Sequence, residues 1–415
     1  MAIKGRSILG LCVFLTLAGV VGFASWYDTQ RVSQPSAVMY KAVLARVTNS
    51  ADRGPGTLRE ALFLVAGATG PASIAIEVPS IRLETALPPF VNLHEVKLVG
   101  QPAGAQIDAR ALSEGPVFDI AGANISIEGI VIQNCPGTAV LVRAMHFRLA
   151  GSVVQSCDVG VDIAENASDT VLEHNKFAKD RLGVRFGASR RGSVVASNEF
   201  VDDKDAGLWA VRGAPDASDE PVAIRDNNFT RVSNAIVAGN VPVLVERNDF
   251  INPSEAAVHI VGAGAVIRGN HVSGGASMGI VGENAQGAII ESNELEGLRA
   301  YGIMLRGSSS VLVRGNRLHN CGYGLAFVLG DSHNVSTAVD NTIIEPKFNG
   351  IDVIGDSPNL RRNQVLHPHA NALHVEDFQP PNGQKVASQP VLDNNNFDSG
   401  SLQGATAASL PVASK

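Results

Sequence analysis

Two residues near the C-terminal end of the chain have the side chains of a general base. Asp352 and His374 are 22 residues apart, and each lies between two apolar residues in a similar short segment. A carboxylate that orients an imidazole makes a workable base for removing a proton next to a carboxylate group. We therefore interpret Asp352 and His374 as candidate catalytic residues. A solvated, histidine-rich edge is the alternative.

A second group of polar residues could bind an acidic sugar. Asp162, Arg185 and Trp209 occupy the same position in three successive segments of similar pattern. Arginine can neutralise a uronate carboxylate, and tryptophan can stack on a sugar ring. The alternative is an ordinary exposed Asp–Arg pair, which surfaces often contain.

Three further residues are candidates for substrate binding. Tyr301 and Tyr323 each directly precede a glycine and are 22 residues apart, so we expect their rings to stack. They could supply a phenolic acid or simply pack against each other. His259 holds the same position in its segment as Asp162 and Arg185 do in theirs.

These candidates belong to an internal repeat. An Asn-x-apolar pattern recurs ten times, most often every 22 or 23 residues, at Asn175, Asn198, Asn227, Asn248, Asn270, Asn293, Asn316, Asn341, Asn363 and Asn395. A second pattern, a small residue followed by apolar-x-apolar, runs in phase with it, as in Gly302-Ile303-Met304-Leu305. Such alternation predicts short strands with one buried face.

The repeat is too short for a pair of helices, and it fits one coil of a parallel β-helix. Strands of successive coils would then stack about 4.8 Å apart. We expect each repeated asparagine to occupy a left-handed turn, with its side-chain amide bonded to the next asparagine. The outward positions of one strand would form a column that reads Asp162, Arg185, Trp209, Val237, His259, Val281, Met304, Ala326, Asp352 and His374.

The chain also resembles a known group of proteins. Val47 to Leu62 resembles the N-terminal cap segment of exported right-handed parallel β-helix proteins, and Val96-Lys97-Leu98-Val99-Gly100 is similar to the first coil after that cap. The resemblance implies an all-β, single-stranded right-handed parallel β-helix with an N-terminal helical cap. It implies a cap and first coil over residues 46–100 and coils over 101–398. The Ala/Ser-rich composition of residues 399–415 predicts a disordered tail.

The group includes pectate-lyase-like enzymes, uronan epimerases and adhesins, so the resemblance implies two alternative functions. One is an exported lyase or C5-epimerase that removes the C5 proton of a uronate-containing polysaccharide. The other is a non-catalytic carbohydrate-binding, adhesive or scaffolding rod of the cell envelope. Mannuronan epimerases carry an Asp-Pro-His-Asp run on this kind of strand, and in Asp352-Val353-Ile354-Gly355 only the first acid matches.

Two insertions could wall one face of the rod. Residues 212–221 and 376–390 lengthen their coils, and both directly follow the strand that carries the outward column. Loops that leave a rod at the same phase border the same face, so we expect a groove there.

The N-terminal residues are typical of an export segment. Lys4 and Arg6 precede an apolar run from Ile8 to Trp26. Residues 1–28 would be a cleaved signal peptide or a retained membrane anchor, with the rest of the chain periplasmic or extracellular. The net charge of −7 without a basic block argues against nucleic acid as a partner. The resemblance implies a polysaccharide as the partner.

The cysteines predict a disulfide and no metal site. Cys135 and Cys157 fall at the same phase of adjacent coils, so they could form a disulfide or a buried thiol stack. No CxxC or His/Cys ligand spacing occurs, and we expect no cofactor. Calcium would find its densest acids at Asp202, Asp203 and Asp205, in a turn where aspartate is common for structural reasons.

Overall fold

The computed structural model describes residues 42–91, 93–101, 104–187, 192–213, 220–275, 277–330, 334–381, 383–398 and 401–403. The expected signal peptide or anchor and most of the expected tail lie outside these residues. Within the described ranges, no helix is both long and apolar enough to cross a bilayer.

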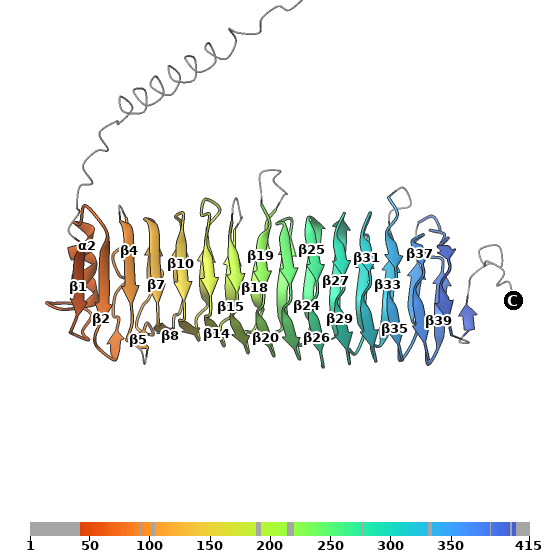
Figure 1. Ribbon diagram of the computed structural model, residues 1–415, viewed down its shortest axis with the longest axis horizontal. Coiled ribbons are helices and arrows are strands. Elements are labelled where there is room, and N and C mark those ends of the chain that lie inside the picture. Colours follow the sequence, from red (N-terminus) through yellow and green to blue (C-terminus); the bar gives the residue numbers. More distant parts are fainter. Residues whose placement is uncertain are drawn as a thin grey trace, which may run out of the picture. The chain divides into compact units, whose positions relative to one another are not determined.

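The described chain winds into a parallel β-solenoid in which almost every coil gives one strand to each of three sheets (Figure 1). All strand pairs within the three sheets are parallel, and each strand pairs with its counterparts in the coils before and after it. The predicted β-helix architecture is therefore confirmed.

The bounds of the strands follow the predicted short segments. The 15-stranded sheet contains β1 (Val43–Val47), β2 (Ala72–Ile76), β4 (His94–Val99), β7 (Ala123–Glu128), β10 (Phe147–Ala150), β13 (Val171–Glu173), β16 (Val194–Ala196), β19 (Val222–Arg225), β22 (Val243–Glu246), β25 (Ala265–Arg268), β28 (Ile289–Glu291), β31 (Leu312–Arg314), β34 (Thr337–Val339), β37 (Asn359–Arg361) and β40 (Val391–Asp393). The 14-stranded sheet contains β3 (Ser80–Arg82), β5 (Ala105–Asp108), β8 (Ile130–Gln133), β11 (Val153–Gln155), β14 (Lys176–Ala178), β17 (Glu199–Val201), β20 (Asn228–Thr230), β23 (Asp249–Ile251), β26 (His271–Ser273), β29 (Glu294–Glu296), β32 (Arg317–His319), β35 (Thr342–Ile344), β38 (Gln364–Leu366) and β41 (Asn396–Phe397). The 13-stranded sheet contains β6 (Phe118–Ile120), β9 (Thr138–Val142), β12 (Val159–Ile163), β15 (Leu182–Phe186), β18 (Ala206–Val211), β21 (Asn234–Gly239), β24 (Ala256–Ala263), β27 (Met278–Gln286), β30 (Tyr301–Arg306), β33 (Tyr323–Val328), β36 (Ile351–Ile354), β39 (Asn371–Glu376) and β42 (Ser401–Gln403).

The core consists of the inward-facing residue of each strand, stacked on the same residue of the next coil. Four phenylalanines of the 14-stranded sheet, Phe177, Phe200, Phe229 and Phe250, stack in this way with ring centroids 4.5 to 5.1 Å apart. All four are at most 1% exposed, and burial of such a side chain contributes about 2 kcal/mol to folding. Stacking of like residues is what fixes the register between coils.

The repeated asparagines form a buried ladder at the corner between the 15- and 14-stranded sheets. The Oδ1 atom of Asn248 accepts the backbone N–H of Asn227 at 3.0 Å, and its Nδ2 atom donates to the Oδ1 atom of Asn270 at 3.1 Å. The predicted bonding from one asparagine to the next is confirmed. The predicted left-handed backbone of the asparagines is wrong, because the left-handed residue is the one before, such as Asp226 or Arg247. That residue turns the corner, and the turn aims the asparagine side chain inward.

The one helix of the described chain, α2 (Leu58–Ala66), lies beside β1 at the start of the solenoid (Figure 1). The Thr57 hydroxyl accepts from the backbone N–H of Glu60, and the Glu60 carboxylate accepts from the backbone N–H of Gly56. These two contacts satisfy N–H groups at the start of the helix. The helix buries Leu58, Leu62 and other apolar residues, and its role as a cap stays a prediction.

Candidate functional site

The predicted outward column exists, with every neighbouring pair in register. It crosses the 13-stranded sheet from β12 to β39 through the pairs Asp162–Arg185, Arg185–Trp209, Trp209–Val237, Val237–His259, His259–Val281, Val281–Met304, Met304–Ala326, Ala326–Asp352 and Asp352–His374. Strand alternation alone places these residues outward, because their neighbours on either side are the core residues of the coil. The sequence repeat therefore locates the whole column.

At the C-terminal end of the column, Asp352 and His374 are in direct contact. The Nδ1 atom of His374 lies 3.0 Å from the Oδ1 atom of Asp352, and the amide of Asn349 donates to the same oxygen at 2.7 Å. Asp352 is 4% exposed, and this burial raises the pKa of its carboxyl, against the opposing effects of Asn349 and His374. The Nε2 atom of His374 lies 4.0 Å from the Glu376 carboxylate. The pair is thus a histidine oriented by a buried acid.

An aromatic stack lies next to this pair. The rings of Tyr301 and Tyr323 stack with centroids 4.8 Å apart, and the ring of Phe348 stacks on Tyr323 at 5.0 Å. Burial, together with the neighbouring Tyr323 and Asp352, raises the pKa of Tyr301, so its phenol keeps its proton at neutral pH. Phe348 is 48% exposed, although it is large and apolar. An exposed aromatic surface of this kind is suited to contact with the apolar face of a sugar ring.

Two residues of this region were missed by the sequence analysis. Phe348 precedes Asn349-Gly350, so it lies one residue earlier than Tyr301 and Tyr323 do relative to their glycines. Arg306 ends β30 two residues after Met304, and its exposed guanidinium group has no hydrogen-bond or ion-pair partner among the described residues. The alternation of β30, continued to its last residue, would have identified Arg306.

The group at the other end of the column is built around an ion pair. The Nε atom of Arg185 donates to the Oδ1 atom of Asp162 at 2.8 Å, and a second contact makes the pair bidentate. Trp209, the next residue of the column, is 36% exposed. Six strand spacings of about 4.8 Å separate Trp209 from Asp352, so the two groups lie about 29 Å apart and do not form one site. His259 lies between them, with its Nε2 atom 3.4 Å from the Glu283 carboxylate.

The two insertions leave the solenoid at the predicted phase. Residue 212 follows β18 directly, and residues 214–219 of that insertion lie outside the described part of the chain. The second insertion follows β39 and folds back through an antiparallel bridge between Phe378 and Val386. The Ser388 hydroxyl accepts the backbone N–H of Gly355 at 2.7 Å, which ties this loop to the end of β36. That the loops wall a groove stays a prediction.

The acids considered for calcium have other partners. Asp202 pairs with Arg231, Asp205 pairs with Arg181, and Asp203 is buried beneath the turn. Across the described ranges, no group of three or more His, Cys, Asp or Glu side chains is placed to hold a metal ion. The structure pairs Cys135 with Cys157, with Cα atoms 4.3 Å apart, and buries Cys321 elsewhere. The disulfide itself stays a prediction.

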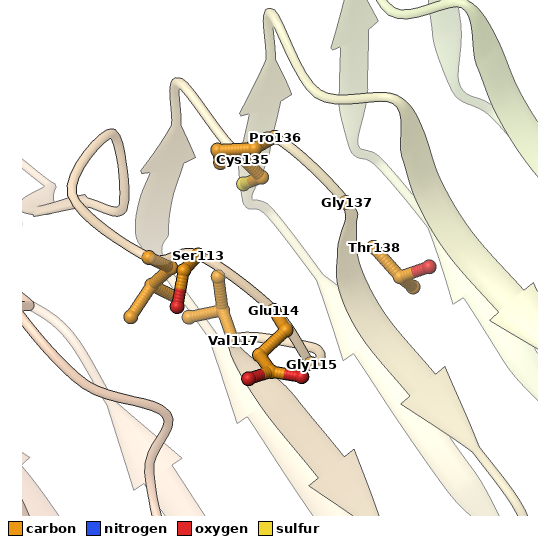
Figure 2. A pocket seen from close by; sticks show the side chains of 9 residues that line it. Ser113, Glu114, Gly115, Val117, Cys135, Pro136, Gly137 and Thr138 are labelled. Atoms are coloured by element: carbon orange, nitrogen blue, oxygen red, sulfur yellow. The ribbon is translucent and has the colours of Figure 1, made fainter.

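One small hollow adjoins the cysteine pair. It has a volume of about 90 Å³ and is lined by residues of the turns that precede β6 and β9, among them Leu112, Glu114, Cys135 and Thr138 (Figure 2). Ligand pockets usually measure about 300 to 1,000 Å³. This hollow is therefore too small for a sugar residue.

Comparisons with known proteins agree with the fold. The family model described as "Right handed beta helix region" matches residues 215–365. No curated protein matches the chain by sequence. The described chain is thus a right-handed parallel β-solenoid, as predicted.

Several solved structures share this fold at low sequence identity. The catalytic unit of a GH87 α-1,3-glucanase from Streptomyces thermodiastaticus aligns with a TM-score of 0.56 and 14% identity, over 91% of this chain and 72% of that chain. A PL6 family polysaccharide lyase from Pseudopedobacter saltans aligns with a TM-score of 0.54 and 14% identity, over 88% and 94%. The A-module of the mannuronan C-5 epimerase AlgE6 from Azotobacter vinelandii aligns with a TM-score of 0.54 and 14% identity, over 85% of this chain and 98% of that chain. At these identities the likeness establishes the fold alone.

Proposed function

We propose that the protein acts on a uronate-containing polysaccharide, with His374 as the base that removes the proton from C5 of the sugar. The observation that carries this proposal is the contact of 3.0 Å between His374 Nδ1 and the buried carboxylate of Asp352. The contact lies beside an exposed aromatic stack, on the outward column of the 13-stranded sheet.

The geometry assigns separate tasks to the two residues. When His374 donates its Nδ1 proton to Asp352, its Nε2 atom carries the lone pair that can accept the C5 proton. The imidazolium that results is stabilised by the Asp352 carboxylate, and Asn349 holds that carboxylate in place through its amide. Asp352 is thus a positioning residue, and His374 is the group that meets the substrate.

The aromatic stack would hold the polymer. Tyr301, Tyr323 and Phe348 span three successive coils and present stacked rings, of which the two tyrosines are half-buried and Phe348 is exposed. Such rings bind the apolar face of a sugar ring and do not distinguish sugars by the arrangement of their hydroxyl groups. Arg306, whose guanidinium group has no partner in the described chain, could neutralise a uronate carboxylate. It lies three strand spacings, about 14 Å along the rod, from the coil of His374, so it would contact a neighbouring sugar residue of the polymer.

The structural neighbours support a polysaccharide as the substrate class. By their names, they are a polysaccharide lyase, a mannuronan C-5 epimerase and an α-1,3-glucanase. Lyases and C5-epimerases begin with the same proton abstraction, which is the step that a histidine–aspartate pair can perform. They differ in the second step, since the lyase expels the group at C4 and the epimerase returns a proton to the opposite face.

A non-catalytic binding protein is the second candidate, and one observation favours it. Removal of a C5 proton requires that the carboxylate of the same sugar be neutralised, and Arg306 lies too far along the rod to do this for a sugar held at His374. The aromatic stack alone would suffice for a protein that only binds the polymer.

The two candidates are separated by incubating the full chain with a panel of uronate polymers in D₂O and following the products by proton NMR. Unsaturated chain ends indicate a lyase, and deuterium at C5 without chain cleavage indicates an epimerase. Binding without either signal would overturn the catalytic proposal and leave the binding protein. Absence of both binding and signal with every polymer would overturn the choice of substrate class.

We also propose that the chain is exported, because Lys4 and Arg6 precede the apolar run from Ile8 to Trp26. Cell fractionation with N-terminal sequencing of the mature protein tests this proposal. A new N-terminus near residue 25 to 29 indicates a cleaved signal, and an intact chain in the membrane fraction indicates an anchor. An intact chain in the cytoplasm would contradict export.

A further inference from the structure

A larger hollow lies far from His374, at the corner between the 14- and 13-stranded sheets. It measures about 620 Å³ and is lined by the turns that join β11 to β12, β14 to β15 and β17 to β18, with Cys135 at one end. The first two turns have three residues and the third has four, residues 202–205. The extra residue brings both Lys204 and Asp205 to the rim. The neighbouring turns contribute Asp158, and Lys179 with Arg181.

One cation of the hollow is immobilised by acids on both sides. The Nε atom of Arg181 donates to the Oδ1 atom of Asp158 at 2.6 Å, and its Nη1 atom donates to the Oδ2 atom of Asp205 at 3.1 Å. Arg181 and these two acids therefore satisfy one another. The third acid, Asp202, points to Arg231 of the next turn, whose Nε atom donates to its Oδ1 atom at 2.7 Å.

The other two cations that line the hollow, Lys179 and Lys204, form no ion pairs of this kind within the described ranges. Lys179 and Lys204 are exposed, and neither ammonium group has a hydrogen-bond or ion-pair partner within the described ranges. Lys179 lies near enough to Asp202 to lower the pKa of that acid, whose main partner is Arg231. The hollow and its immediate partners thus contain four cations against three anions, in a chain whose net charge is −7: Lys179, Arg181, Lys204 and Arg231 against Asp158, Asp202 and Asp205.

The acids beneath the hollow do not reverse this balance. Asp180 and Asp203 are almost fully buried under Lys179 and Lys204, and burial raises the pKa of both carboxyls, that of Asp203 to about 8. The raised pKa values favour the neutral form of both carboxyls, so these acids add little negative charge beneath the hollow.

We propose that this corner hollow binds an anionic group carried on a sugar chain, a carboxylate or a sulfate, between the ammonium groups of Lys179 and Lys204. Its volume lies within the range of ordinary ligand pockets. The turn that holds Lys204 leads directly into β18, which presents the exposed ring of Trp209. Cation and indole together suit an acidic sugar followed by a second ring.

The hollow is a site separate from the His374 pair. Eight strand spacings, about 38 Å, separate β15 from β39. A long polymer could occupy both places, and two linked attachments hold a chain more tightly than either alone. The inference rests on the proposed function only in its choice of an acidic polysaccharide as the ligand.

Calorimetric titration of the full chain tests the proposal with three oligosaccharides of equal length: an oligouronate, a sulfated oligosaccharide and a neutral glucan. The double variant Lys179→Gln/Lys204→Gln is compared with Arg82→Gln/Arg361→Gln, which removes two exposed cations from other faces of the rod, where they also form no ion pair with the described residues. We expect anionic ligands to bind the parent and the control equally, and the lysine variant about tenfold more weakly.

Each result decides the matter. If the lysine variant loses affinity for the oligouronate alone, the hollow binds a carboxylate. If it loses affinity for the sulfated oligosaccharide alone, the hollow binds a sulfate. The proposal would be overturned if the neutral glucan bound the parent as tightly as the anionic ligands, if neither anionic ligand bound, or if the two double variants bound the anionic ligands with equal affinity. Because the lysines lie far from His374, proton exchange at C5 of short substrates should be unchanged in the lysine variant, which separates failure of this site from failure of the proposed function.

Discussion

Asp203 accepts the backbone N–H of Asp180 through its Oδ1 atom at 3.0 Å, so that two buried carboxyl groups lie one above the other in adjacent coils. Asp180 accepts the backbone N–H of Cys157 in the same way at 2.7 Å. The Oδ2 atoms of both acids have no hydrogen-bond partner in the described structure. Two such groups cannot both ionise without large cost, because burial and mutual repulsion oppose the second charge.

The stability of the protein should therefore fall as the pH rises toward 8. The pKa of Asp203 is about 8 in the folded chain and near 3.8 in the unfolded chain, so folding takes up a proton between these values. The stabilisation is complete below pH 3.8 and is lost as the pH approaches 8, by up to about 1.4 kcal/mol per pH unit. Denaturant unfolding at pH 5, 6, 7 and 8 measures how the free energy of unfolding depends on pH. Asp203→Asn keeps the Oδ1 acceptor and should flatten the dependence, and an unchanged slope would contradict the assignment.

Asn248→Ala should destabilise the solenoid by about 3 kcal/mol. The substitution removes a buried side chain that accepts from Asn227 and donates to Ile224 and Asn270, and it leaves their polar groups unsatisfied. Chemical denaturation gives the free energy of unfolding. Asn228→Ala serves as the control, at the neighbouring half-buried position, where the side chain forms one hydrogen bond within the described structure, accepted from the Thr230 hydroxyl. Equal losses of unfolding free energy in the two variants would show that the asparagine ladder adds nothing to the stability of the solenoid.

Cys135 and Cys157 should be linked in the protein purified from an oxidising compartment. Their Cα atoms are 4.3 Å apart, while Cys321 is buried and the pKa of its thiol is raised to about 11, so it stays unreactive. Peptide mapping by mass spectrometry without reduction should find one cross-linked peptide containing residues 135 and 157. Two alkylated peptides in its place would show a pair of buried thiols.

Tyr323→Ala should weaken polysaccharide binding about tenfold. Tyr323 is the middle ring of the stack, and its loss separates Tyr301 from Phe348. A tenfold change corresponds to about 1.4 kcal/mol, which is typical for the loss of an aromatic contact. Titration with the polymer identified as substrate provides the measurement. Met145→Ala, an exposed apolar residue of another surface, is the control, and equal affinity of the two variants would exclude the stack as a binding surface.

The repeat predicted the column of residues well for a physical reason. In a β-helix, each coil satisfies its backbone on the coils before and after it, and strand alternation decides which side chains point outward. A sequence period and an alternation are therefore enough to stack Asp352 on His374 and Asp162 on Arg185. Direct contact between these side chains follows from the spacing of the strands.

The corners were predicted less well, because turn geometry depends on single residues and not on a period. The sequence predicts the left-handed conformation for the asparagines, although the structure gives it to the preceding residues. These are of different types, such as His174, Ser197 and Arg247. The repeat does not predict Phe348 as part of the stack, because Asn349 separates it from its glycine, whereas Tyr323 directly precedes its glycine. The hollow near Lys204 depends on one additional residue in a turn, which a repeat with variable gaps does not reveal.

The central claim is that His374 removes a proton from C5, and the most direct test is deuterium entry at C5 in D₂O with His374→Ala beside His271→Ala. The control is closely matched, because the Nδ1 atom of His271 lies 2.8 Å from an Asp249 oxygen on the 14-stranded sheet, away from the aromatic stack. We predict that His374→Ala lowers the exchange or elimination rate at least about 100-fold with binding retained, while His271→Ala keeps the parent rate. Equal rates in the two variants would contradict the account.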